Sequence, residues 1–365
     1  MSQHFSKLFS PYQLGNITLS NRIVMAPMTR SRATGNIPNE LMAEYFAARA
    51  TAGLIITEGT SPSPNGLGYA RIPGIFSEAQ IAGWRKVTDA VHAEGGHIFV
   101  QMMHTGRISH PLNLPEGAEV IAPSPVAAAN TQMYTDQEGL VALPVPKEVK
   151  TSDIPALISE FVHAAQAAVE AGFDGVELHA ANGYLLEQFL NSGTNHRTDQ
   201  YGGSFENRNR FVLEVAAAVA NAIGKERTAI RLSPFGVANE IVPDETTEEQ
   251  YIALAEGLQK IGVVYIHIVD HAALGAPQVP DSIKEAIGRN YNGTIIISGG
   301  YDAERAEADL ETEKGDLVAF GRPFISNPDL VERLRTGAEL QTPDHTTFYT
   351  PGEKGYTDYP VLATV

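Results

Sequence analysis

Eight short apolar runs, separated by longer segments of helical periodicity, restrict the fold of this chain more than any other feature. The runs are rich in β-branched residues and do not alternate polar with apolar positions, which is typical of strands buried on both faces of a parallel sheet. Eight strand–helix alternations favour a (β/α)8 TIM barrel over an open doubly wound sheet. The expected strands are Arg22–Ala26, Gly53–Glu58, His97–Met102, Gly175–His179, Thr228–Leu232, Val263–Val269, Thr294–Ile297 and Leu317–Phe320.

Helix starts support this alternation at three places. Ser77–Gln80 and Thr246–Glu249 have capping-box spacing before amphipathic runs. Asp153–Ala171 has the pattern of a helix with a proline in its first turn. A doubly wound dinucleotide-binding sheet would carry a Gly-x-Gly-x-x-Gly turn after its first strand, and none follows Ala26.

One interval is too long for a simple strand-to-helix connection. About fifty residues separate the third expected strand from Asp153, far beyond the usual loop length. We therefore expect a single domain, residues 1–365, with an inserted excursion after strand 3, roughly residues 105–150. Thr131–Thr135 and Leu140–Leu143 are expected to pair there as a hairpin. The insertion is interpreted either as a lid over the catalytic end or as an ordinary surface loop.

Composition excludes several classes of function. The formal net charge is −17, and phosphate backbones require basic surfaces, so no nucleic-acid partner is expected. The lack of cysteine excludes disulfides, thiolate metal sites and cysteine-ligated iron–sulfur clusters. The histidine pairs His104/His110 and His267/His271 lack companions at a recognisable ligand spacing, so no metal site is expected. Residues Met1–Lys7 have no apolar signal core and no run approaches a membrane span of ~18 residues, so we expect a cytoplasmic protein without membrane association.

The sequence His179-Ala-Ala-Asn182-Gly-Tyr184 is the strongest functional signal. It follows Phe173–Leu178, which has the pattern of a buried strand, and catalytic groups of β/α barrels lie just past the strand ends. A pair of hydrogen-bonding side chains beside a phenol suits an enzyme that holds an oxygen on which negative charge develops and then delivers a proton nearby.

Glycines and an arginine follow the last two expected strands. Gly299 and Gly300 come after the seventh strand, and Gly321 and Arg322 after the eighth. Loops at these positions of β/α barrels often bind phosphate through backbone N–H groups, and arginine adds a forked cation. The pattern therefore predicts a ligand that carries a phosphate group.

Three polar residues occupy strand ends where an apolar residue would be easier to bury. Thr29 follows the first strand, and Gln101 and Arg231 lie at the ends of the third and fifth strands. An amide and a guanidinium can recognise a ring with both donors and acceptors, such as the N1–C2=O2–N3 edge of an isoalloxazine. Arg231 would also stabilise negative charge near N1 of a reduced flavin.

Over nearly its whole length the chain resembles the Old Yellow Enzyme family of FMN-dependent ene-reductases, and it is close to bacterial members. The matching stretches are Asn21–Arg30, His179–Tyr184, Asn195–Ser204, Glu206–Arg208, Phe320–Asp329 and Lys354–Pro360. The His-x-x-Asn-Gly-Tyr and Asn-His-Arg-x-Asp-x-Tyr-Gly-Gly patterns are highly specific.

The resemblance implies a role for each candidate residue. In catalysis, His179 and Asn182 hold the substrate oxygen and Tyr184 donates the proton. The residues implied at the flavin ring are Pro27, Thr29, Gly59, Gln101 and Arg231, and those at the FMN phosphate are Gly299, Gly300, Gly321 and Arg322. Tyr69 and Met103 are implied to line the substrate pocket. Many relatives have an aromatic residue at the position of Met103, and the nearest have alanine at that of Gly59.

The resemblance also implies the reaction. NADPH or NADH delivers hydride to N5 of a tightly bound FMN, and an α,β-unsaturated carbonyl compound, imide or nitroalkene then accepts it in a ping-pong cycle. We expect these small molecules as the partners, and a monomer or weak homo-oligomer. The alternative is a flavin-free, phosphate-binding aldolase or isomerase, which would need a Schiff-base lysine or a carboxylate base at a strand end. No convincing candidate for either residue is evident in the sequence.

Overall fold

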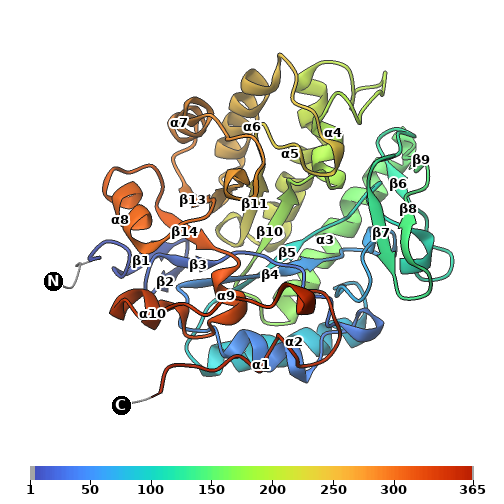
Figure 1. Ribbon diagram of the computed structural model, residues 1–365. Coiled ribbons are helices and arrows are strands. Elements are labelled where there is room, and N and C mark those ends of the chain that lie inside the picture. The colour runs from blue at the N-terminus through green and yellow to red at the C-terminus, as the bar shows by residue number, and fades with distance from the viewer. Residues whose placement is uncertain (1–4, 364–365) are drawn as a thin grey trace.

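Eight parallel strands close into a barrel, and helices surround it (Figure 1). This computed structural model describes residues 5–363 of the chain. The strands follow one another around the barrel in the order β10-β11-β12-β13-β14-β3-β4-β5. Their bounds are β3 Ile23–Met25, β4 Leu54–Thr60, β5 Ile98–Met102, β10 Gly175–Ala180, β11 Thr228–Leu232, β12 Tyr265–Ile268, β13 Thr294–Ser298 and β14 Leu317–Phe320.

The predicted (β/α)8 barrel is confirmed, and every expected strand coincides with an observed one. Two of the expected strands were too long at both ends, because β3 and β12 are shorter than the apolar runs that contain them. Strand β4 instead runs on to Thr60, with an irregular register between Ile56 and Gly59. All seven residues of β4 and all six of β10 are buried, as expected for strands covered on both faces.

Helices follow the barrel strands and bury an apolar face against their outer surface. This layer between helices and strands forms the largest hydrophobic core, which contains Trp84, Phe161 and Phe211. The helices are α1 Glu40–Ala47, α2 Glu78–Ala93, α3 Ile154–Glu170, α4 Leu185–Leu190, α5 Phe205–Ile223, α6 Thr247–Ile261, α7 Asp281–Asn290, α8 Ala303–Glu311, α9 Pro323–Ser326 and α10 Leu330–Thr336. None of the helices in residues 5–363 combines the length and apolar character needed to cross a bilayer.

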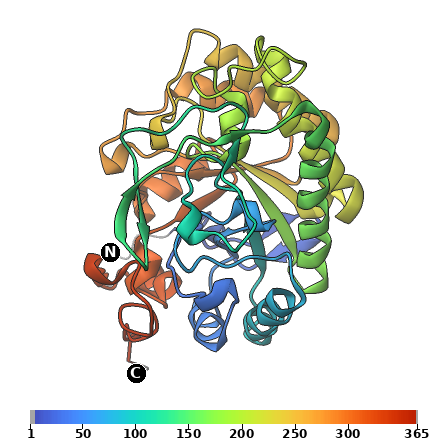
Figure 2. The same ribbon diagram turned by 90° about the vertical axis from the view of Figure 1, so that its right-hand side faces the viewer.

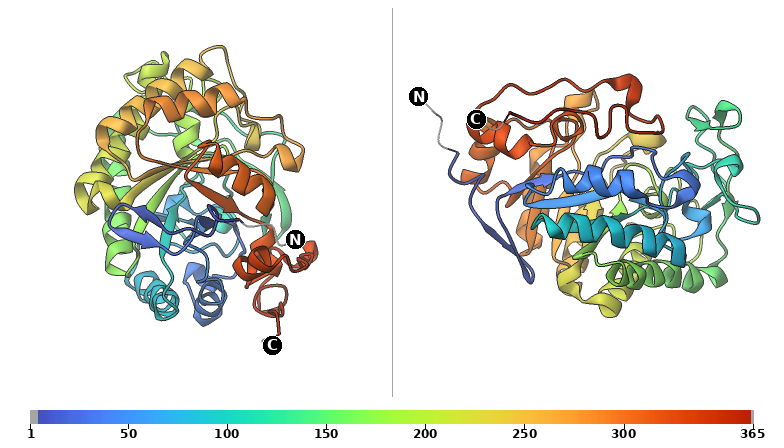
Figure 3. Two further views of the ribbon diagram at one scale, coloured as in Figure 1. Left: turned by 90° about the vertical axis from the view of Figure 1, so that its left-hand side faces the viewer. Right: turned by 90° about the horizontal axis from the view of Figure 1, so that it is seen from below.

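A two-stranded hairpin covers the amino-terminal end of the barrel. Strands β1, Tyr12–Leu14, and β2, Ile17–Leu19, pair antiparallel at the end opposite the long insertion (Figure 3). Leu14 and Leu19 pack on residues inside the barrel, including Phe99. The hairpin therefore covers the end of the barrel opposite the carboxyl ends of the strands.

The long insertion after β5 forms small sheets beside the barrel mouth. Strands β7, Gln132–Thr135, and β8, Gly139–Ala142, pair antiparallel, so the predicted hairpin is present with its second strand one residue earlier. Strands β6, Ile121–Ala122, and β9, Lys147–Glu148, form a second short pair. Figure 2, seen from the side of this insertion, shows it in front of the barrel strands.

The helix starts agree with the sequence in two of three cases. Ser77 and Gln80 form a capping box at α2, with both reciprocal bonds present, and Pro155 lies in the first turn of α3. The capping box predicted at Thr246 was wrong. The Thr246 hydroxyl donates to Asp244 (2.7 Å) and accepts from Arg208 (2.9 Å), so it is not available to cap α6.

The capping box predicts a measurable loss of folding stability when its serine is replaced. Ser77→Ala leaves the Gln80 backbone N–H without its side-chain acceptor, and we expect a cost of about 1 kcal/mol in unfolding free energy. Urea unfolding followed by circular dichroism measures it. The exposed Ser159, inside α3, provides the control, because Ser159→Ala removes only a bond to its own helix. Equal midpoints for the two variants would contradict the capping role.

Candidate active site

The turn after β10 brings the three predicted catalytic residues together. His179 lies near the end of the strand, and Tyr184 precedes the first residue of α4. Asn182 and Gly183 between them have φ angles of 57° and 76°, a left-handed conformation that glycine adopts readily and asparagine better than most residues. The turn reverses the chain, so the rings of His179 and Tyr184 meet edge-on with centroids 5.0 Å apart.

A buried carboxylate holds this turn in place. Ser233 accepts from the Asn182 backbone N–H (3.0 Å) and donates to Glu187 Oε1 (2.6 Å). The other carboxylate oxygen of Glu187 accepts from the Gly183 N–H (2.6 Å), and the Tyr251 hydroxyl donates to Oε1 (3.1 Å). Neither Glu187 nor Ser233 was predicted from the sequence, although a carboxylate at the start of an apolar helix was a visible signal.

The side chain of Asn182 is oriented by His271, a residue considered in the sequence only as part of a metal pair. His271 Nε2 lies 2.9 Å from Asn182 Oδ1. With the amide oxygen bonded to His271, the amide nitrogen is left free to donate to a ligand. The backbone carbonyl of Asn182 accepts from Asn239 Nδ2 (2.7 Å), so the turn is held from a second loop as well.

Burial keeps the catalytic groups in their neutral forms. Burial, followed by the positive charge of Arg231, lowers the pKa of His179 well below its ordinary value. Burial likewise raises the pKa of Tyr184, although a hydrogen bond from Tyr69 opposes the rise. The two phenol oxygens lie 2.9 Å apart. At neutral pH the site therefore contains an uncharged imidazole and a phenol that retains its proton.

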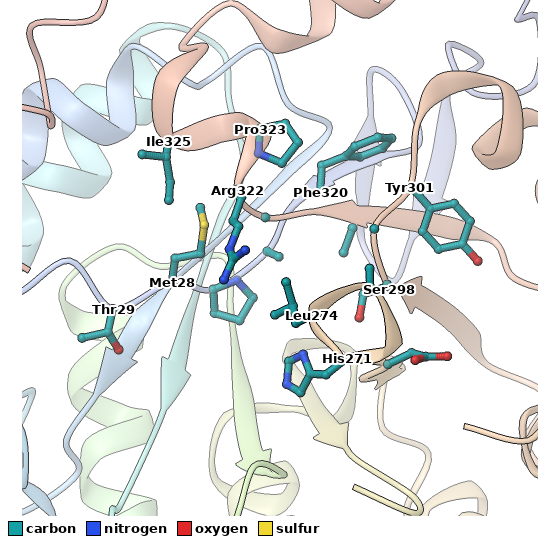
Figure 4. A pocket seen from close by; sticks show the side chains of 18 of the residues that line it. Met28, Thr29, His271, Leu274, Ser298, Tyr301, Phe320, Arg322, Pro323 and Ile325 are labelled. Carbon is teal, nitrogen blue, oxygen red and sulfur yellow. The ribbon is translucent and has the colours of Figure 1, made fainter. Parts of the chain in front are cut away.

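A cavity of about 330 Å³ opens beside this turn at the carboxyl ends of the strands. Seven predicted cofactor residues line it: Pro27, Thr29, Arg231, Gly299, Gly300, Gly321 and Arg322. Figure 4 shows Arg322 pointing into the pocket between Met28 on one side and Leu274 and His271 on the other. The carboxyl-terminal segment contributes Phe348 and Tyr349, which the sequence analysis did not anticipate.

The glycines of the pocket suit a bound anion. Gly299 and Gly300 have φ angles of 137° and 67°, which L side chains rarely adopt. At Gly321 a Cβ would come no closer than 3.7 Å to Met28 Sδ, which is an ordinary contact. Packing within the protein therefore does not require glycine at 321, and close approach of a ligand to the backbone explains it better.

Polar groups inside the barrel extend the site beyond the cavity. Arg231 is buried, and its Nε has no hydrogen-bond partner among the described residues. Gln101 donates from Nε2 to Glu177 (2.8 Å) and pairs in register with Gly59 on β4. A buried cation without a protein partner and a glycine-rich cradle for an anion fit a planar ring with a phosphate tail, as FMN has.

Two departures from the family pattern are coupled in space. A Cβ at Gly59 would lie 2.5 Å from Met103 Sδ, so a side chain at 59 would displace Met103. Met103 packs in a small cluster with Leu67 and Ile72, and both Tyr69 and Tyr184 contact this cluster. The structure therefore places Met103 and Tyr69 beside the proposed proton donor.

The carboxylate of Glu187 predicts a pH dependence of stability. Burial raises its pKa from 4.5 to about 7, partly offset by bonds from Ser233 and the Gly183 N–H. Because the folded pKa lies above the unfolded one, the folded state binds the proton more tightly, and this stabilisation is lost as pH rises through about 7. Glu187→Gln does not titrate. We therefore expect its melting temperature, relative to the parent protein, to rise between pH 4.5 and about 7 and then level off.

Scanning calorimetry across this pH range measures the difference. Glu58, whose pKa burial also raises to about 7, titrates in both proteins and cancels from the comparison. A difference that does not change with pH would contradict the assignment.

The protein family that this chain matches consists of flavin oxidoreductases, which agrees with a pocket that suits FMN. The model of the NADH:flavin oxidoreductase / NADH oxidase family matches residues 7–341. 12-oxophytodienoate reductase 7 from Oryza sativa subsp. japonica is 42% identical over 379 residues, which cover 99% of this chain and 96% of that protein. The structure of morphinone reductase in complex with tetrahydroNAD has a TM-score of 0.93 and 47% identity over 98% of both chains.

A second solved structure, that of the Old Yellow Enzyme homologue from Zymomonas mobilis, has a TM-score of 0.92 and 41% identity, covering 98% of this chain and 100% of that one. These matches span the whole barrel and the turn, cavity and glycine loops described above. The chain therefore belongs to the NADH:flavin oxidoreductase / NADH oxidase family and is an FMN-dependent ene-reductase of the Old Yellow Enzyme type that takes its electrons from NAD(P)H.

Proposed function

We propose that this protein reduces the C=C bond of α,β-unsaturated carbonyl compounds, imides or nitroalkenes in a ping-pong cycle, with Tyr184 as the proton donor. The observation that carries the proposal is that one turn holds a neutral His179 and Tyr184 together with Asn182, which bonds to His271 in the lining of the cavity. When bound, FMN would supply the hydride-transfer chemistry, with NADPH or NADH as the reductant. Family membership argues against the flavin-free aldolase or isomerase.

His179 and Asn182 act as donors to the substrate oxygen. A neutral imidazole can donate one N–H, and the Asn182 amide nitrogen is free because its oxygen is bonded to His271. Since both groups are fixed before the substrate arrives, they stabilise the charge that builds on the oxygen without reorganisation. His179 Nδ1 has no partner in the described residues, which leaves it available to the ligand or to water.

Tyr184 delivers the proton to the carbon next to the activating group. Burial maintains its O–H form, and Tyr69 is the adjacent phenol that can donate to its oxygen. If Tyr69 is the donor of this pair, the Tyr184 proton points away from Tyr69 and is available for transfer. Arg322 and the glycine loops are proposed to hold the phosphate, and Arg231 and Gln101 the ring.

The β7–β8 hairpin is proposed to serve as a lid. Met133 of β7 and Leu143 after β8 pack in one cluster that Tyr69 and Tyr184 also contact. Arg71 connects the hairpin to the rest of the mouth, because it pairs with Asp136 and donates to the Tyr349 carbonyl. Excluding water from the phenol pair would protect the transferred proton. We also propose a single domain, cytoplasmic location, and a monomer or weak homo-oligomer.

The proposal is tested first by the colour of the protein. We expect absorption near about 450 nm that NADPH bleaches under anaerobic conditions and 2-cyclohexenone restores, since the flavin carries the hydride between them. In His179→Ala, restoration should slow on the order of 10²-fold or more, because one oxygen donor is lost. Stopped-flow absorbance measures both steps. If bleached protein is not reoxidised by any activated alkene while oxygen reoxidises it, alkene reduction is not its function.

A matched pair of tyrosine variants tests the proton donor. Tyr184→Phe should slow alkene reduction by roughly 10²–10⁴-fold, because the general acid is removed. Tyr69→Phe removes the neighbouring hydroxyl and leaves the donor in place, so a smaller loss is expected. Product formation under anaerobic conditions measures both, with the rate of FMN reduction by NADPH as the control. Equal losses in the two variants would contradict the assignment to Tyr184.

A further inference from the structure

A buried carboxylate that the proposed mechanism does not use lies inside the barrel. Glu177 is on β10, two residues before His179, so both side chains point to the same face of the sheet. Its side chain is completely buried. It accepts hydrogen bonds from Gln101 Nε2 (2.8 Å), the Tyr265 hydroxyl (3.0 Å) and His267 Nδ1 (2.9 Å).

This carboxylate is ionised in spite of its burial. Burial raises its pKa, but the interaction with His267, followed by the charge of Arg231 and the hydrogen bond from Gln101, outweighs burial, and the pKa lies below its ordinary value. Burying a carboxylate is costly, and apolar residues of similar volume would often stabilise a core as well or better. A role beyond packing would explain why the charge is there.

The first consequence is a fixed orientation of Gln101. An ionised carboxylate can only accept hydrogen bonds, so the group that Gln101 turns toward Glu177 must be its amide nitrogen. The amide oxygen is then left as the free end of the side chain. A flavin ring presents one N–H along its pyrimidine edge, at N3, and a free amide oxygen is the group that can accept from it.

The second consequence concerns the charge of Arg231. Arg231 pairs in register with His179 on one side and with His267 on the other, so its side chain shares the barrel interior with theirs. Among the charges acting on Arg231, that of Glu177 is the strongest and raises its pKa against the effect of burial. Tyr265 and His267 are the other titratable groups bonded to Glu177, and both stay uncharged, because burial raises the pKa of the phenol and lowers that of the imidazole. The positive field of Arg231 is therefore partly cancelled by Glu177.

We propose that Glu177 is a positioning residue for the cofactor: it fixes the amide of Gln101 as an acceptor and weakens the field of Arg231, and so sets both the affinity for FMN and the reduction potential. The inference rests on the placement of the ring at Gln101 and Arg231 given under the proposed function. It does not depend on which alkene the protein reduces.

Three variants of the full-length protein separate the two effects. In Glu177→Gln the charge is lost and the Gln101 amide is no longer held by an obligate acceptor. We expect the FMN dissociation constant to rise about tenfold, the value of one net hydrogen bond, and the potential to become less negative, because reduced flavin gains negative charge. Gln101→Leu keeps the charge, so it should lose similar affinity with a smaller change in potential. Tyr265→Phe is the control, since it removes one other donor to Glu177.

The measurements need no alkene and no turnover. FMN fluorescence quenching on titration of apoprotein gives the dissociation constant, and reduction against a reference dye gives the potential. Near-parental values are expected for Tyr265→Phe. The proposal is overturned if Glu177→Gln leaves both quantities unchanged, or if Tyr265→Phe changes them as much. If Glu177→Gln does not fold, Gln101→Leu decides: parental FMN affinity in that variant overturns the proposal, and a loss supports it. Failure of alkene reduction would leave these results intact.

Discussion

The register of the parallel strands is the constraint on which the active site depends. Hydrogen bonding around the barrel aligns Gly59 with Gln101 and Gln101 with Glu177 in one layer. It aligns His179 with Arg231 in the next layer toward the mouth. Side chains of a strand alternate between its two faces, so a slip of one residue would turn these polar groups into the apolar layer under the helices. Barrel closure therefore determines which side chains can meet.

Three buried glutamates show how surroundings decide the state of one residue type. Burial raises the pKa of Glu58 and of Glu187 to about 7, and neither the arginines Arg30 and Arg32 beside Glu58 nor the hydrogen bonds to Glu187 outweigh it. Glu177 is buried as deeply, but His267 and Arg231 hold its pKa below the ordinary value. The neutral His179 and the ionised Glu177 consequently lie only two residues apart on the same strand.

Periodicity and local motifs were sufficient for the barrel, the hairpin and most of the pocket. The apolar runs predicted all eight strands, because a strand buried on both faces needs a continuous apolar sequence. The same local reasoning failed at Thr246, where Arg208 and Asp244 occupy the hydroxyl. It also left His271 unassigned, since nothing in the local sequence shows that this residue reaches Asn182, eighty-nine positions away.

By itself, then, the sequence determined the order of strands and helices and the residues that lie at the end of each strand. These properties depend on neighbours along the chain, through backbone preference and hydrophobic periodicity. Only the tertiary structure decided which amide end of Asn182 and of Gln101 is free, that Gly59 makes room for Met103, and which carboxylates are charged. Those properties depend on burial and on partners from distant strands, which become neighbours only when the barrel closes.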